Sequence, residues 1–341
     1  MGSAQDSGLQ WPISVRLDTI AAMLNFEIHN HSVYQGIEIQ YFDDAEHGTG
    51  MLVLMRRSDN GTVDVYHQAG LRIDRTGYGI GAGLGEWKIT KIEPAVLEVA
   101  DTGVRARIAL RDMTGRSIEI SIDDWGGKPQ RSAEFLAPVG AAIEQPTALM
   151  LVWMRRFNLV RRTRIDPVVN IDGVPVTLGR LPGAWLHRRH LIKYACDLWV
   201  VNVNPPDSDG RREAGRPDAA HALLHFSPEP PAPGTLSPGD ERKGKWSLSI
   251  GDHAGVISGE WVCTGGEIAT LTLTVTRGWR PRGLPPLMRV VTTVLPVFRR
   301  WPTTYLWEAR ADLRGTPEVA AEWRRTKRAG ESPYTRVTSQ R

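Results

Sequence analysis

Residues 164–205 read RIDPVVNIDGVPVTLGRLPGAWLHRRHLIKYACDLWVVNVNP, and this stretch decides the fold. Its first half places Asp172-Gly173 between two runs rich in β-branched residues, 168–171 and 174–178. A two-residue Asp-Gly loop favours a tight β-hairpin, because glycine adopts positive φ without steric cost. The second half gathers two imidazoles and three cations between apolar residues, which disturbs the alternation of a half-buried strand. The stretch therefore predicts antiparallel β-structure that carries a polar cluster.

Apolar and polar residues alternate in the chain that precedes this stretch. Ile37, Ile39 and Tyr41 alternate with Glu38 and Gln40, and a period of two indicates a strand with one buried face. Turn-forming pairs that end in glycine recur at intervals of about 8–12 residues, the spacing of an antiparallel sandwich or barrel. Helices of about 10–15 residues do not separate these segments, which argues against a parallel α/β sheet. We predict strands at residues 25–29, 36–42, 50–56, 62–67, 87–92, 95–100, 104–111 and 117–122.

The C-terminal half has the same character. Thr-rich and Val-rich segments predict further strands at residues 245–250, 255–263 and 267–276. Thr316-Pro317-Glu318 predicts the start of a helix that ends near Arg328, because proline suits the first helical position and an acid suits the first turn. The Pro- and Gly-rich segments that remain predict loops at residues 204–218 and 228–244.

A chain of 341 residues is longer than a single hydrophobic core usually supports. We therefore predict an all-β fold of two antiparallel barrel or sandwich units, residues 1–163 and 164–341, with a short C-terminal helix. The apolar run 149–154 fits either a buried strand or a helix. Residues 284–301 contain prolines, and we interpret them as two strands with arginines at their ends.

Composition narrows the class of protein. The hydrophobic fraction of 41% and the charged fraction of 23% are typical of a globular domain. A net charge of only +4, spread along the chain, argues against nucleic acid as the main partner. Arginine far outnumbers lysine, which suggests a bacterial source with a GC-rich genome. Two cysteines far apart in sequence support neither a disulfide framework nor a cysteine metal site.

The N-terminal residues are polar and lack the order of a signal peptide, and no run of about 18 apolar residues occurs. We therefore expect a cytoplasmic protein. The glycine-rich segment Gly77–Gly85 superficially resembles a phosphate-binding loop. Such a loop needs a helix N-terminus after it, whereas a strand led by Trp87 follows here. We expect a flexible loop, a lid at a barrel mouth, and no nucleotide or other cofactor.

Four Gly-x-Trp triplets occur, at Gly85, Gly183, Gly244 and Gly259, more than the 34 glycines and 12 tryptophans would give by chance. Gly-x-Trp resembles the lipocalin signature, in which the glycine opens a strand and the indole closes one end of a β-barrel. The plan of two β-units joined by the central stretch is similar to the tandem-lipocalin family that includes carotenoid 1,2-hydratases and related pericyclases. The resemblance implies a lipocalin-like barrel that holds a hydrophobic ligand.

Four residues are candidates for acid–base chemistry. His187 and His190 lie in the sequence LHRRH, within the disturbed strand of the central stretch. Asp43 and His47 lie in a run with further carboxylates at the end of a predicted strand. Crowded carboxylates raise one another's pKa, which can yield a proton donor near neutral pH. A solvated turn is the simpler interpretation of that run.

Aromatic side chains and other imidazoles are candidates for the lining of a ligand pocket. We predict ligand-binding residues at Trp87, Trp153, Trp185, Tyr194, His29 and His31. His29 and His31 alternate on one strand face, which points either into a barrel or to water. His221 and His225 would share a helix face, as zinc ligands do, but on a strand they are too far apart, and we predict no metal.

Three classes of function fit these features. The first is a protein that binds a hydrophobic or amphipathic small molecule in a β-barrel pocket. The second is a cofactor-independent hydro-lyase, isomerase or cyclase of a lipid, terpenoid or polyketide. The third is a module that contacts a membrane surface or another protein through a basic, Trp-containing region. That region consists of Trp279, Arg280, Arg299, Arg300 and Trp301.

Overall fold

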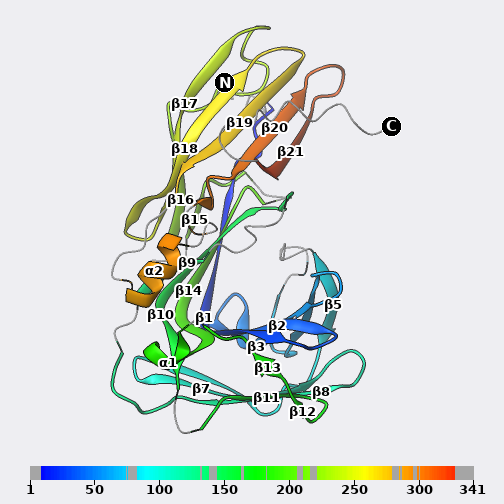
Figure 1. Ribbon diagram of the computed structural model, residues 1–341. Helices are drawn as coiled ribbons and strands as arrows, with labels where there is room; N and C mark the ends of the chain where they lie inside the picture. Colours follow the sequence, from blue (N-terminus) through cyan, green and yellow to red (C-terminus); the bar gives the residue numbers. More distant parts are fainter. Residues whose placement is uncertain are drawn as a thin grey trace.

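The computed structural model consists almost entirely of strands, arranged in three sheets (Figure 1). It describes residues 9–73, 75, 83–130, 133–137, 144–162, 165–181, 183–205, 210–215, 221–278, 284, 286–294, 298 and 300–326. The predicted class, an all-β protein of antiparallel units with a short helix towards the C-terminus, is confirmed.

The largest sheet has nine strands and lies in the middle of the molecule. Its order is β5-β4-β3-β2-β1-β14-β10-β9, with β13 beside β1, and all its pairs are antiparallel except β4 with β5. Figure 1 shows it curling into a half-barrel. Its strands are β1 (Val15–His29), β2 (Tyr34–Asp44), β3 (Gly48–Arg57), β4 (Val63–His67), β5 (Leu84–Ile89), β9 (Ala133–Ala137), β10 (Leu149–Arg161), β13 (Thr177–Leu178) and β14 (Arg189–Val203). The run 149–154, which fitted either a strand or a helix, is thus part of a strand.

A five-stranded sheet covers one end of this half-barrel, in the order β12-β11-β8-β7-β6. It contains the predicted hairpin: Ile171 pairs with Val174, and both loop residues have positive φ, 53° at Asp172 and 74° at Gly173. These angles define the turn that Asp-Gly favours, so the hairpin prediction is confirmed. The strands are β6 (Ala95–Ala100), β7 (Gly103–Arg111), β8 (Ser117–Asp123), β11 (Val168–Ile171) and β12 (Val174–Pro175).

A seven-stranded sheet, ordered β15 to β21 as in the sequence, lies at the opposite end. Its last strand occupies Glu318–Arg325, so the helix predicted for residues 316–328 is wrong. The segment pairs with the preceding strand from Glu318 to Arg325, and this pairing buries Trp323 opposite Trp307. The strands are β15 (Glu213–Gly215), β16 (His221–Ser227), β17 (Glu241–Ile250), β18 (His253–Thr264), β19 (Ile268–Arg277), β20 (Tyr305–Asp312) and β21 (Glu318–Arg325).

Two short helices accompany the sheets. Helix α1 spans Ala184–His187, and α2 spans Pro286–Val294. The interpretation of residues 284–301 as two strands is therefore wrong for most of that segment. Pro286 stands at the first position of α2, where a helix does not need the backbone N–H that proline lacks.

Two of the Gly-x-Trp triplets pack against each other in the seven-stranded sheet. Gly244 pairs with Trp261 across strands β17 and β18, and Trp246 pairs with Gly259. A Cβ added to Gly244 would lie 2.5 Å from the Trp261 indole, and one added to Gly259 would lie 2.6 Å from the Trp246 indole. Each glycine therefore makes room for the indole of the other triplet, which accounts for their recurrence by packing.

Strands β1, β10 and β14 belong to two cores at once. Their upper parts pack against the seven-stranded sheet, with Leu151 and Trp153 of β10 in that core. Their lower parts pack against the five-stranded sheet, with Leu24 and Phe26 of β1 in that core. Strands β11 and β14 follow residue 164 yet pair with β8, β1 and β10. The division predicted between residues 163 and 164 is thus crossed by strand pairing.

The other face of these three strands forms a third core. In each strand, the residues of this core include one irregular step, a pair of residues three positions apart. The step is Ile20 to Met23 in β1, Met154 to Phe157 in β10 and Ala195 to Leu198 in β14. Residues on one face of a regular strand are separated by even numbers, whereas each of these steps is three residues. Arg156 and Asp197 lie within two of these steps and have φ angles of 48° and 62°. The steps lie side by side and form a line across the sheet.

Candidate functional site

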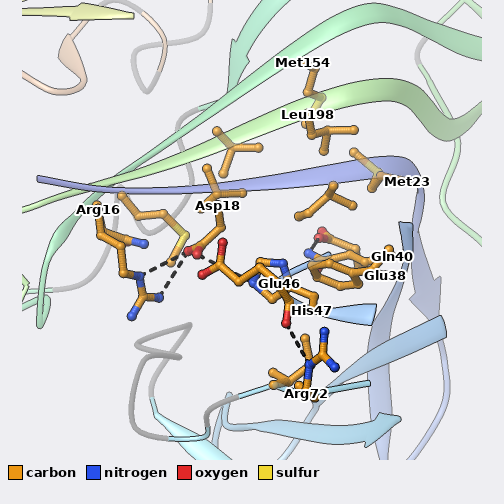
Figure 2. Close-up of a pocket in the computed structure, with 17 residues that line it drawn as sticks. Arg16, Asp18, Met23, Glu38, Gln40, Glu46, His47, Arg72, Met154 and Leu198 are labelled. Atoms are coloured by element: carbon orange, nitrogen blue, oxygen red, sulfur yellow. Dashed lines mark hydrogen bonds and ion pairs between the residues drawn. The ribbon is translucent and has the colours of Figure 1, made fainter. Parts of the chain in front are cut away.

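A cavity of about 290 Å³ opens on the third-core face of the nine-stranded sheet, on the upper side of the irregular steps (Figure 2). One wall of this cavity is apolar. Its side chains come from one face of three neighbouring strands, at alternate positions in β10 and β14 and on both sides of the three-residue step in β1. They are Ile20 and Met23 of β1, Met150, Val152 and Met154 of β10, and Leu198 and Val200 of β14. Methionines suit a wall that must adapt to different shapes, because their side chains are flexible.

The opposite side is polar and centres on His47. Asp44 accepts hydrogen bonds from the backbone N–H groups of Glu46 and His47, each 2.8 Å long, through Oδ1. Its Oδ2 lies 3.0 Å from His47 Nδ1. A carboxylate can only accept here, so we assign the ring proton to Nδ1 and leave the lone pair on Nε2. Asp44 therefore fixes both the orientation and the tautomer of this imidazole.

A second carboxylate stands on the other side of the ring. Asp18 Oδ1 lies 3.9 Å from His47 Nε2. Arg16 holds Asp18 in place, since its Nε and Nη2 lie 3.2 and 3.1 Å from Oδ2. The ring of Phe42 packs against the imidazole with the ring centroids 5.0 Å apart. His47 is 9% exposed, and its imidazole lies among two carboxylates and an aromatic ring at the cavity (Figure 2).

Arg72 ties down the loop that carries His47. Its Nε donates to the carbonyl oxygen of Glu46 at 3.0 Å, and its backbone N–H donates to the carbonyl oxygen of His47 at 2.8 Å. The side chains of Arg72 and Glu46 line the cavity beside His47 (Figure 2). The loop between β2 and β3 is therefore anchored by contacts outside its own hairpin, which limits its movement.

Glu38 forms a second polar region of the cavity. Its Oε1 accepts from Gln40 Nε2 at 2.6 Å and its Oε2 from Asn25 Nδ2 at 3.0 Å. Burial raises the pKa of this carboxyl, against the effect of these two hydrogen bonds and of the Lys193 charge. Glu38 shares a strand face with Phe42, about 13 Å away at roughly 3.3 Å per residue. The two polar regions therefore lie at different ends of the apolar wall.

Of the four candidates for acid–base chemistry, His47 lines the cavity. Asp43 is exposed and accepts a hydrogen bond from the Thr49 hydroxyl. His187 lies in α1, where its Nδ1 accepts from the backbone of Arg189. His190 is the second residue of β14, and burial lowers its pKa while its Nε2 faces Asp166 at 3.8 Å. The structure does not bring these three to His47.

The predicted ligand-binding residues lie outside the cavity. Trp153 and Tyr194 are buried in the cores under the seven-stranded and five-stranded sheets, so they serve packing. Trp185 projects from α1 and is 80% exposed. Trp87 is partly buried in β5, where its Nε1 donates to His67 at 3.1 Å.

The two remaining imidazoles of that prediction lie at the lower end of β1. His29 is the exposed last residue of the strand. His31 lies in the following turn, where its Nδ1 accepts from the backbone N–H of Tyr34 at 3.0 Å. A residue that closes a turn in this way is not directed into a barrel.

The cavity contains functional candidates that the sequence analysis missed. Asp18, Glu38 and Asn202 were interpreted as outward-facing residues of half-buried strands or were not singled out. Polar residues at alternate positions give the same pattern whether that face meets water or a cavity. The spacing of Asp44 and His47, three residues apart across a turn, is the one local signal of the arrangement.

Other predicted features have plainer outcomes. Among the described residues, no group of three or more His, Cys, Asp or Glu could hold a metal ion. His221 and His225 lie four residues apart on strand β16, about 13 Å at roughly 3.3 Å per residue. None of the helices in the described part of the chain is long and apolar enough to span a membrane.

The proposed membrane-contact region is only partly described. Trp301 is buried in the core under the seven-stranded sheet, so its indole is not offered to a surface, whereas Arg300 is exposed. Trp279, Arg280 and Arg299 lie outside the described residues, as does most of the loop Gly77–Gly85 that we interpreted as a lid.

Comparisons with known proteins do not add a family. No protein-family model, no curated protein and no solved structure matches the chain.

Proposed function

We propose that the protein binds a small amphipathic molecule in the cavity beside His47. The supporting observation is the cavity's composition: seven aliphatic and methionine side chains form one wall, and ionisable groups stand at its ends. Burying an apolar ligand against such a wall contributes about 25 cal/mol per Å² removed from water. A few fixed polar groups then orient the ligand.

The polar groups indicate the kind of ligand. Asp18 and Asp44 are both occupied by cationic or hydrogen-bonding partners, and Glu38 has a raised pKa. The cavity therefore suits a molecule with an uncharged polar group, such as a carbonyl or a hydroxyl, more than one with a strong charge. The curled β-sheet is compatible with the lipocalin-like resemblance, which remains part of this proposal.

A cavity-filling substitution tests the proposal. In Val200→Trp the indole would occupy the cavity, so we expect affinity for the neutral probe N-phenyl-1-naphthylamine to fall at least tenfold in a fluorescence titration. Leu223→Trp, at a half-exposed position of β16, is the matched control and should bind like the wild type. Circular dichroism of both variants checks that the fold persists.

Two results would contradict the proposal. One is a wild-type protein that gives no saturable probe fluorescence. The other is equal affinity of the Val200→Trp variant and the control. Independently of the probe, mass spectrometry of organic extracts of the purified protein identifies any molecule that co-purifies with the wild type and is lost from Val200→Trp.

A further inference from the structure

The arrangement around His47 goes further than ligand binding requires. Asp44 gives the imidazole one tautomer, with the proton on Nδ1 and the lone pair on Nε2. If Nε2 takes up a proton, the resulting cation lies between the Asp44 carboxylate at 3.0 Å and that of Asp18 at 3.9 Å. Each carboxylate offers an acceptor oxygen to one of the two ring nitrogens. These are the requirements of a positioned general base.

Asn202 supplies a neutral hydrogen-bond donor on the sheet wall of the cavity, the wall that His47 faces. It lines the cavity, is 5% exposed and pairs with Arg16 across strands β14 and β1. Arg16 lies two residues from Asp18, about 7 Å along the strand. A base and a donor that both contact a group CH–C=O stand about 8 Å apart, with roughly 3 Å for each contact. Asp18 lies beside His47 and Asn202 pairs with Arg16, two residues from Asp18, so both groups border the same part of the cavity.

We propose that the cavity is a site of proton transfer on carbonyl compounds, with His47 as the base and Asn202 as the donor to the carbonyl oxygen. This inference rests on the proposed function, since the molecule must first bind against the apolar wall. Asp44 is a positioning residue in this scheme, because it acts through the imidazole and does not touch the substrate.

The step balances without a cofactor. His47 Nε2 takes the proton from the carbon beside the carbonyl, so a C–H bond breaks and an N–H bond forms. The electron pair of that C–H bond forms a C=C bond, and the carbonyl π electrons move to oxygen, where the Asn202 amide N–H stabilises the negative charge. The imidazolium then returns its proton to the same carbon, or to the far carbon of an adjacent double bond. The first outcome is exchange and the second is isomerisation.

The substrate class is therefore an uncharged ketone or aldehyde with an apolar body and a hydrogen on the carbon beside the carbonyl. The apolar body lies along the methionine and aliphatic wall toward Glu38. The carboxyl of Glu38 meets the far end of the molecule and hydrogen-bonds a polar group there.

Deuterium exchange into 4-phenyl-2-butanone tests the proton transfer directly. We expect the full-length protein in D₂O to accelerate exchange beside the carbonyl at least tenfold over an equal concentration of free imidazole, measured by proton NMR. His47→Gln should abolish the acceleration, and added imidazole should partly restore it. Asp44→Asn should lower the rate at least tenfold and change its pH profile, which a merely structural role would not do.

The controls separate this inference from the binding proposal. His190→Gln alters an imidazole outside the cavity and should leave the exchange rate unchanged. Displacement of N-phenyl-1-naphthylamine by the ketone is measured on the same samples. If the probe binds but the ketone does not displace it, or if the wild type is no faster than His47→Gln, the inference is overturned and the binding proposal stands. If the probe itself does not bind, both fail.

Discussion

The two faces of the nine-stranded sheet are built from the same strands and differ in what covers them. On β10, Leu151 and Trp153 point into a core closed by the seven-stranded sheet, whereas Val152 and Met154 face the cavity. Both faces are equally apolar at these positions. A pocket therefore depends on what covers each face: the seven-stranded sheet fills one, whereas the third core on the other leaves a cavity lined in part by the loop that Arg72 binds.

The largest difference between the faces should appear when neighbouring residues are truncated. We expect Trp153→Ala to lower the free energy of unfolding by about 3–5 kcal/mol, because it leaves a cavity in a filled core. Met154→Ala, one residue along, should cost about 2 kcal/mol or less, since its side chain already borders open space. Urea denaturation of both variants measures this. Equal losses would mean that the two faces are packed alike.

A smaller effect should follow from the carboxyl on the cavity face. The pKa of Glu38 is raised by burial, so the folded protein keeps a proton that the unfolded chain has lost at pH values above its ordinary pKa. Stability conferred at this position therefore falls as the pH rises toward the raised pKa. We expect the stability of the wild type relative to Glu38→Gln to decline over that window. Thermal denaturation of both proteins at successive pH values checks it, and parallel curves would contradict the burial of this carboxyl.

The smallest effect concerns the line of irregular steps where the cavity ends. Arg155 Nη1 lies 2.9 Å from Asp197 Oδ2, and its guanidinium lies over the Trp199 ring at 4.9 Å. Both partners of the ion pair are about 40% exposed, at 42% and 43%. We expect Arg155→Ala to lower the free energy of unfolding by about 1 kcal/mol or less. A loss well above this, in the same urea assay, would show that the pair holds the bend of the sheet.

Local sequence signals predicted the parts of the fold that depend on neighbours in the chain. The Asp172-Gly173 hairpin is one such part, because its turn needs only two residues with positive φ. The helix predicted for residues 316–328 failed for the opposite reason. Its proline and acid are suited to a helix start, yet pairing with β20 buries Trp323 and overrides that preference.

The candidate site shows the same limit. His47 could be singled out because carboxylates at positions 43, 44 and 46 precede it in sequence. Its second carboxylate partner, Asp18, comes from a different strand, and Glu38 alternates with Ile37 and Ile39 as any surface residue would. The sheet curls, which is a non-local property, and both Asp18 and Glu38 line its cavity. Such contacts leave no trace in a local pattern.

The three-residue steps in β1, β10 and β14 constrain how this protein can change over time. Deleting Asp197 would restore regular alternation in β14, while the neighbouring strands β1 and β10 kept their three-residue steps. Every side chain on one side of the deletion would then point the wrong way relative to the adjoining strands. Single-residue insertions and deletions are therefore tolerated at these steps only if all three strands change together. Segments nearly 180 positions apart in the sequence must then evolve together.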